Sequence, residues 1–131
     1  MSDKSLLDLA DEEFVLLTTF RRSGERVSTP VWVARDGDRL VVITPDGTGK
    51  TKRIRANSSV EVTPCDRRGR PKPWATTVAG RAEVRSSAQD TEAARAAIKA
   101  KYRLQFAVFM TIERLVKRMR DTPRVALWIT A

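Results

Sequence analysis

The sequence contains no histidine, and this absence excludes several classes of catalyst. Without histidine there is no Ser-His-Asp or Cys-His catalytic couple, no histidine-rich metal site and no histidine-ligated haem. The single cysteine, Cys65, also excludes an internal disulfide framework and a cysteine-based zinc cluster. We therefore expect no metal site and no catalytic side chain. If the protein is an enzyme, a cofactor must carry the chemistry.

Long apolar runs are also missing. None approaches the roughly 20 residues that span a bilayer, so we expect no membrane-spanning role. Met1 to Lys4 leads into acidic sequence and lacks the basic start of a signal peptide, which predicts a cytoplasmic protein. The chain has 131 residues, 41% hydrophobic and 31% charged, a composition typical of one globular domain over residues 1–131.

Basic residues outnumber acidic ones by 25 to 16, and the excess is unevenly distributed. Residues 1–13 contain five acids and one base, whereas Gly47 to Lys72 contains eight bases and two acids. Such a surface favours an anionic partner: nucleic acid, an acidic lipid face or a polyanionic small molecule. Nucleic acid is the weaker interpretation, because no binding signature is present and aromatic residues near the basic segment are scarce.

Hydrophobic periodicity predicts six short strands, at 14–20, 26–34, 39–44, 59–63, 74–85 and 124–130. Tight turns between the first three predict an antiparallel meander. Helices are expected within the acidic residues 1–13, at 48–56 with Asp46 or Thr48 as cap, and at 87–120 as an insertion before the last strand. These elements suggest a small closed or split barrel.

The stretch Thr44 to Thr51 predicts an anion site. Gly49-Lys50-Thr51 follows a strand and opens a helix as in a P-loop, but Thr44 stands where a P-loop requires glycine. The glycines still allow a ligand to approach the backbone, and Lys50 lies in the first helical turn, on one face with Arg53. The segment therefore predicts a phosphate-sized site; the alternative is a solvated, charged helix.

Other segments allow two interpretations each. Trp32 is out of phase with its neighbouring valines, which indicates a ligand wall or an interface, with core packing as the alternative. The apolar segment Leu104–Met110 predicts a barrel plug or a subunit contact. Basic residues 67–72 form either a nucleic-acid contact or a mobile loop. Cys65 is interpreted as an inert hydrophobe, although nearby bases could lower its pKa.

The order of these segments resembles the flavin-binding split barrels of the pyridoxamine-phosphate-oxidase type. Thr44 matches a strand-end threonine of that family, Thr48-Gly49-Lys50 stands at its Ser-Arg-Lys segment, and Asn57-Ser58 stands at its Asn-Pro. Ser28–Trp32 and Val62–Asp66 are more similar to the deazaflavin branch, which contains oxidoreductases that depend on coenzyme F420. The arginine that grips FMN phosphate has no clear counterpart, and the missing histidine argues against pyridoxamine oxidation.

The resemblance implies a fold that is mainly β (α+β): a six-stranded antiparallel split β-barrel with two to three peripheral helices. It implies hydride transfer between reduced F420 and an unsaturated, quinone-like or tetrapyrrole acceptor, in a homodimer. Lys50 would contact the phosphate, and the basic residues of 52–55 and 67–72 would suit a poly-glutamate tail. The cofactor-binding residues expected are Thr29, Pro30, Val31, Trp32, Thr44, Thr48, Gly49, Lys50, Lys52, Arg53, Pro64, Cys65 and Trp74. The alternatives are FMN on the same fold and a non-catalytic cofactor- or ligand-binding protein.

Overall fold

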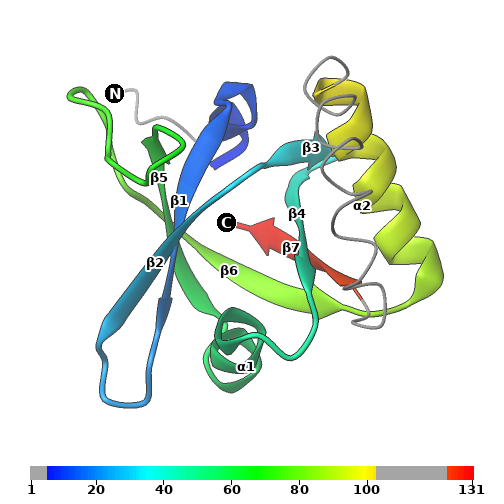
Figure 1. Ribbon diagram of the computed structural model, residues 1–131, viewed down its shortest axis with the longest axis horizontal. Coiled ribbons are helices and arrows are strands. Elements are labelled where there is room, and N and C mark those ends of the chain that lie inside the picture. Colours follow the sequence, from blue (N-terminus) through cyan, green and yellow to red (C-terminus); the bar gives the residue numbers. More distant parts are fainter. Residues whose placement is uncertain (1–5, 103–123) are drawn as a thin grey trace.

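The computed structural model describes residues 6–102 and 124–131. Seven antiparallel strands form one sheet: β1 (Phe14–Phe20), β2 (Arg26–Val31), β3 (Ala34–Asp36), β4 (Arg39–Pro45), β5 (Ser59–Cys65), β6 (Val78–Arg85) and β7 (Arg124–Thr130). Three helical elements accompany the sheet within these residues: the 3-10 helix η1 (Leu6–Asp11), α1 (Gly49–Ala56) and α2 (Ala88–Lys101). The strand order is β2-β1-β5-β6-β7-β4-β3, and the sheet curls into a half-barrel (Figure 1).

The mainly β, split-barrel fold class is confirmed, but the strand count differs from the six expected. The predicted strand 26–34 is interrupted at Trp32 and Val33 and forms two strands, β2 and β3, at opposite edges of the sheet. β2 pairs with β1, whereas β3 pairs with β4. The predicted meander is therefore wrong at this point. The alternation of side chains continues through the crossover from β2 to β3. The sequence pattern therefore does not reveal that the chain leaves one neighbouring strand and pairs with another.

The last strand, β7, lies in the interior of the sheet. β7 pairs with β4 on one side, from Leu40↔Ile129 to Pro45↔Arg124, and with β6 on the other. β6 starts at Val78, later than the predicted Trp74, because the chain before it forms turns. The backbone N–H of Ala75 donates to the carbonyl of Lys72 in one of these turns.

The helices begin where capping residues are available. Thr48 caps α1: its Oγ1 accepts from the Thr51 N–H at 3.4 Å, and the Thr51 hydroxyl donates to the Thr48 carbonyl at 2.9 Å. Asp46, the other candidate cap, accepts instead from the Gly47 N–H and pairs with Arg55. Ser87 caps α2 by accepting from the Asp90 N–H at 3.1 Å. Thr48, one of the two predicted caps, thus sets the start of α1.

Two apolar clusters stabilise the fold. One fills the inside of the curled sheet, where Leu9 of η1 packs with the strand residues Leu17, Leu40, Leu127 and Ile129. The other lies between the sheet and α2, and its buried residues are Ala34, Val41, Ala94, Ile98, Tyr102 and Ala126. Burial on this scale contributes about 25 cal/mol per Å² of apolar surface. The second cluster therefore holds α2 against the sheet.

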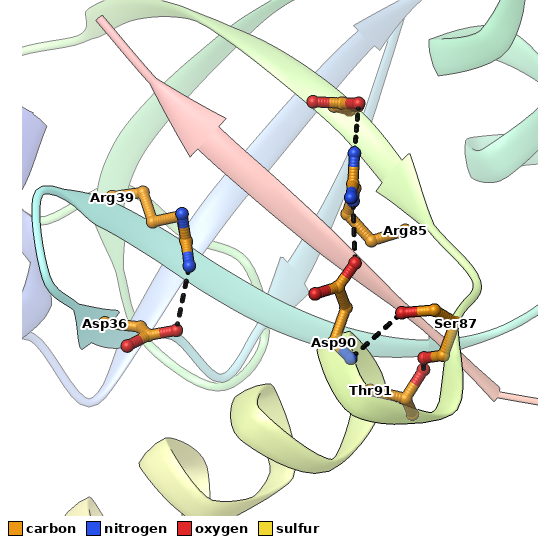
Figure 2. A network of polar contacts seen from close by, with 7 residues as sticks. Asp36, Arg39, Arg85, Ser87, Asp90 and Thr91 are labelled. Carbon is orange, nitrogen blue, oxygen red and sulfur yellow. Dashed lines mark hydrogen bonds and ion pairs between the residues drawn. The ribbon is translucent and has the colours of Figure 1, made fainter.

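Polar contacts fasten the first turn of α2 to the sheet. Arg85 on β6 forms ion pairs with Asp90 at 2.9 Å and with Glu83 at 2.8 Å. In the same network, the backbone N–H of Asp90 donates to the Ser87 hydroxyl (Figure 2). The guanidinium carbons of Arg85 and Arg39 lie 4.1 and 3.7 Å from the ring centroid of Trp128. The Arg85 contacts lower the pKa of Asp90, so this network stabilises the fold at pH values above the titration of that carboxyl.

Two further expectations concern the segment that follows the start of α2 and the basic loop after β5. The segment Leu104–Met110 and most of the predicted insertion 87–120 lie outside the described residues. The basic loop after β5 is ordered by Asp66, whose carboxylate accepts from the N–H groups of Arg68 and Arg70 and pairs with the Arg70 side chain. Among the described helices, none has the length and apolar character needed to cross a bilayer.

Candidate functional site

A cavity of ≈ 360 Å³ lies where the ends of β2 and β4 meet α1 and α2. The described residues that line it are Phe14, Pro30, Val31, Trp32, Ile43, Thr44, Pro45, Lys50, Arg95, Ile98 and Arg124. Most of them are apolar, and all three charged ones are cations. A concave, largely apolar space with a few polar groups is the usual form of a small-molecule site.

The cavity lies beside the gap in the sheet that gives the barrel its split form. β2 is one edge of the hydrogen-bonded order, and β4 lies next to the other edge. The chain passes from β2 directly into β3, so the two edges are brought together without pairing (Figure 1). β2 therefore supplies Pro30 and Val31 on one wall, and β4 supplies Ile43 to Pro45 on the other.

Lys50 is the half-buried cation at the first turn of α1. Burial, followed by repulsion from Arg53, lowers the pKa of its ammonium group. No acidic residue in the described part of the chain forms an ion pair with Lys50, and none of the described lining residues is acidic. An anion placed in the cavity would relieve both unfavourable effects, with additional attraction from the helix N-terminus.

Arg53 lies on the same predicted helical face as Lys50 but does not line the cavity. Its Nε donates to the Thr19 hydroxyl at 2.6 Å, and Thr19 is only 1% exposed. A Cβ at Gly49 would lie 2.7 Å from the Arg53 guanidinium. Gly49 therefore makes room for Arg53, in addition to any access it gives a ligand. Removing Arg53 would disturb the fold, which makes it a poor probe of anion binding.

Trp32 forms a wall of the cavity and is supported from behind by Tyr102. The two rings are stacked, with centroids 4.5 Å apart and an interplanar angle of 7°. Trp32 also packs against the apolar cluster under α2, so the ligand-wall and core interpretations both describe it. Stacked aromatic pairs contribute about 0.5–1.5 kcal/mol beyond their burial. The orientation of this wall therefore depends on Tyr102.

Tyr102 and Lys101 fix the crossover between β2 and β3. The Tyr102 hydroxyl accepts from the Val33 N–H at 3.2 Å and lies 2.6 Å from the Glu13 carbonyl, to which it donates. The Lys101 ammonium donates to the carbonyls of Val33 and Glu12. Burial raises the pKa of Tyr102 to about 12 and lowers that of Lys101 to about 8. Neither residue was singled out from the sequence, because their partners are about 70 to 90 residues away.

The cavity brings together five of the thirteen predicted cofactor-binding residues: Pro30, Val31, Trp32, Thr44 and Lys50. Thr29 lies on β2, and Thr48, Gly49, Lys52 and Arg53 belong to α1 or its cap, without lining the cavity. The remaining three, Pro64, Cys65 and Trp74, lie in β5 and the loop after it. The basic residues of α1 and of that loop are at opposite ends of β5, so they form two separate surfaces.

Cys65 behaves as the inert hydrophobe that one interpretation anticipated. It is 1% exposed, and burial, with a smaller effect from Asp66, raises the pKa of its thiol to about 11. The other prediction, that nearby basic residues could lower the pKa of the Cys65 thiol, is therefore wrong, because the effect of burial outweighs the attraction of Lys72. Trp74, by contrast, is 54% exposed.

Six lining residues were missed: Phe14, Ile43, Pro45, Arg95, Ile98 and Arg124. One signal was available for two of them, because Arg95 and Ile98 are three residues apart and share a face of α2. Arg124 reaches the site because it pairs with Pro45 in the β4–β7 register. Only the tertiary fold reveals that contact, since the two residues are far apart in the sequence.

Several solved structures share this fold. An F420 reductase is 17% identical, with 99% of this chain and 94% of that chain covered and a TM-score of 0.63. A protein of Bacteroides thetaiotaomicron named for 5-nitroimidazole antibiotic resistance is 11% identical over 98% and 80% of the two chains, with a TM-score of 0.66. An FAD-binding protein of Mesorhizobium loti is 17% identical over 93% and 81%, with a TM-score of 0.53.

The comparison of sequence families is more direct. No curated protein matches the chain significantly. The family model described as pyridoxamine 5'-phosphate oxidase, in contrast, matches residues 2–131, which include every described strand and helix. With the split barrel and its cavity, this match establishes that the chain belongs to the pyridoxamine 5'-phosphate oxidase family.

Proposed function

We propose that this protein is an F420-dependent oxidoreductase that reduces an unsaturated, quinone-like or tetrapyrrole acceptor. The observation that carries the proposal is Lys50, a half-buried cation at a helix start, facing an apolar cavity in which no described lining residue is acidic. The fold shared with an F420 reductase supports the same assignment. A planar cofactor that carries a phosphate would place the phosphate at Lys50 and its ring system against the apolar walls.

The chemical types of the cavity residues suit such a cofactor. Lys50 would hold the phosphate, Trp32 and Ile43 would face the ring system, and the exposed Lys52 would lie near a carboxylate-rich tail outside the cavity. The chemistry that F420 supplies when bound is hydride transfer to an unsaturated acceptor, with water providing the accompanying proton. The chain has to orient the two partners and exclude water from the apolar walls, which requires no titrating base.

Cofactor choice provides the direct test. We expect the purified protein to retain F420 more tightly than FMN on dialysis, because FMN lacks the carboxylate tail that exposed cations such as Lys52 attract. The absorbance of the retained cofactor measures both, and F420 with a shortened glutamate tail should be retained less well. Equal or tighter retention of FMN would favour the alternative, an FMN-dependent oxidoreductase on the same fold. Tight F420 binding without reduction of any quinone would favour a non-catalytic binding protein.

We further propose that the protein is a homodimer in which the second copy completes the ligand groove. The exposed Trp74 and the apolar sequence of Leu104–Met110 support this, as large apolar groups on a small protein commonly mark an interface. Light scattering at micromolar concentration should give a mass about twice the 14.7 kDa of the chain. A mass equal to that of one chain would contradict the dimer.

A further inference from the structure

Lys101 connects the backbone segments behind two walls of the cavity, although it does not line the cavity itself. It is the last residue of α2, the helix that packs beside β3 (Figure 1). Its ammonium group donates to the Val33 carbonyl at 2.7 Å and also to the Glu12 carbonyl. Val33 directly follows Trp32, which lines the cavity. Glu12 lies two residues before Phe14, which lines it as well. One nitrogen atom therefore joins the two segments that carry these rings.

Lys101 acts on the cavity differently from its neighbour Tyr102. The Tyr102 ring is stacked on Trp32, and it supports the face of that ring. Lys101 contacts only backbone carbonyls of the two wall segments, and these carbonyls are 68 and 89 residues away from it in the sequence. Its ammonium group therefore controls how closely the segment before Phe14 approaches the segment after Trp32.

The stability of the fold does not account for the charge of Lys101. Burial lowers the pKa of its ammonium group to about 8, although nearby carboxylates attract the charge. Because this pKa is lower in the folded chain than in the unfolded chain, the charged form opposes folding at neutral pH. The ionisable side chains that face this junction in the described part of the chain are those of Asp11, Glu12, Glu13, Lys72 and Tyr102.

We propose that Lys101 is a positioning residue, whose charged form draws the segments of Phe14 and Trp32 together and so sets the width of the cavity for the cofactor ring. The inference rests on the proposed function, in which Trp32 faces a planar ring system. Charge-assisted hydrogen bonds are about twice as strong as neutral ones, so a neutral amine would hold the two carbonyls less firmly. Loss of the proton should therefore widen the cavity and weaken binding of the ring.

The pH dependence distinguishes a positioning role from a structural one. As the pH rises through the titration of Lys101, affinity for the cofactor ring should fall. The contribution of the same group to the free energy of unfolding should rise between its folded pKa of about 8 and its higher unfolded value, because the unfolded chain binds more protons there. If Lys101 had only a structural role, affinity would follow stability instead of opposing it.

Lys101→Met tests the contact, because it keeps an unbranched side chain but removes the donor. At about pH 7 we expect this variant to bind F420 roughly three- to tenfold more weakly than the parent protein, as the wall loses its fixed position. Lys99→Met is the matched control. It removes an exposed cation of the same helix that does not line the cavity, and it should bind F420 like the parent.

The ratio of the parent and Lys101→Met affinities should be followed from about pH 7 to about pH 9.5. Lys50 and the cofactor itself titrate in both proteins, so their effects cancel in this ratio. The advantage of the parent should shrink at least about twofold, beginning near pH 8. Urea denaturation over the same range should show the opposite trend, with the stability difference moving in favour of the parent.

An affinity ratio that does not change with pH would overturn the proposal, and so would a Lys101→Met variant that binds F420 like the parent. If neither F420 nor FMN binds, the proposed function fails, and the wall itself is then followed without a ligand. In protein labelled with 5-fluorotryptophan, the Trp32 resonance, assigned with Trp32→Phe, should shift with a midpoint near pH 8 in the parent and lack this step in Lys101→Met. A Trp32 resonance without such a step in the parent would also overturn the positioning role.

Discussion

Replacing Lys50 by alanine is expected to weaken F420 binding about tenfold to a hundredfold and to leave the fold intact. A charge-assisted hydrogen bond to a phosphate contributes about 1.5–3 kcal/mol, which corresponds to this range of affinity. Burial already lowers the pKa of the Lys50 ammonium, so the folded apo protein gains nothing from the charge. Lys50→Ala should therefore keep its free energy of unfolding within about 0.5 kcal/mol of the parent value. Cofactor fluorescence and urea denaturation measure the two quantities.

Lys52→Ala is the matched control for this experiment. It removes the same charge from the same helix, so it changes the long-range field of the protein in the same way, but Lys52 is exposed and does not line the cavity. We expect it to weaken binding only a few-fold, and less at high salt, because exposed charges are screened. If Lys50→Ala and Lys52→Ala weaken binding equally, the effect comes from net charge, and the phosphate lies elsewhere.

Changing Tyr102 should separate the stability of the fold from the shape of the cavity. Tyr102→Phe keeps the ring stacked on Trp32 but removes the hydroxyl that bonds to the Val33 N–H and the Glu13 carbonyl. Because Tyr102 is 3% exposed, those backbone groups lose a buried partner, and the free energy of unfolding should fall by about 1–3 kcal/mol. F420 affinity should remain near that of the parent protein, since the wall keeps its support.

Tyr102→Leu removes the hydroxyl and the stacking surface together. We expect a further loss of stability and, unlike for Tyr102→Phe, a fall in F420 affinity of roughly three- to tenfold, the equivalent of about 0.5–1.5 kcal/mol for one aromatic pair. Titrations below the unfolding temperature of each variant make the comparison. Equal affinities for the phenylalanine and leucine variants would show that Trp32 needs no support from this ring.

The features that the sequence predicts well are those determined by neighbouring residues. The hydroxyls of Thr48 and Ser87 precede two helices and cap both, because a cap acts over three residues. Alternation identifies most strands for the same reason. The site is different, because Arg95 and Arg124 come together only when α2 and β7 are placed against β4. Local patterns contain no information about that placement.

The interpretation of Arg53 illustrates the same limit within a single helix. Its spacing from Lys50 correctly indicates proximity, since Arg53 contributes to lowering the pKa of Lys50. Spacing cannot indicate that a hydroxyl on β1, 34 residues earlier, is available to hold the guanidinium. A basic residue beside a predicted anion site can therefore be part of the scaffold, and the distinction depends on partners that are distant in the sequence.

The interior position of β7 determines how the sheet must assemble during folding. Before β7 pairs, the hydrogen-bonded strands form two separate ladders, β2-β1-β5-β6 and β4-β3, with β6 and β4 as open edges. Open edges are templates for pairing with other chains, so an incompletely folded chain is vulnerable to aggregation until β7 inserts. Insertion joins residues more than 80 positions apart, such as Leu40 and Ile129, and such distant contacts make folding slow and cooperative. A chain that lacks β7 should therefore accumulate as aggregates, with no folded half-sheet.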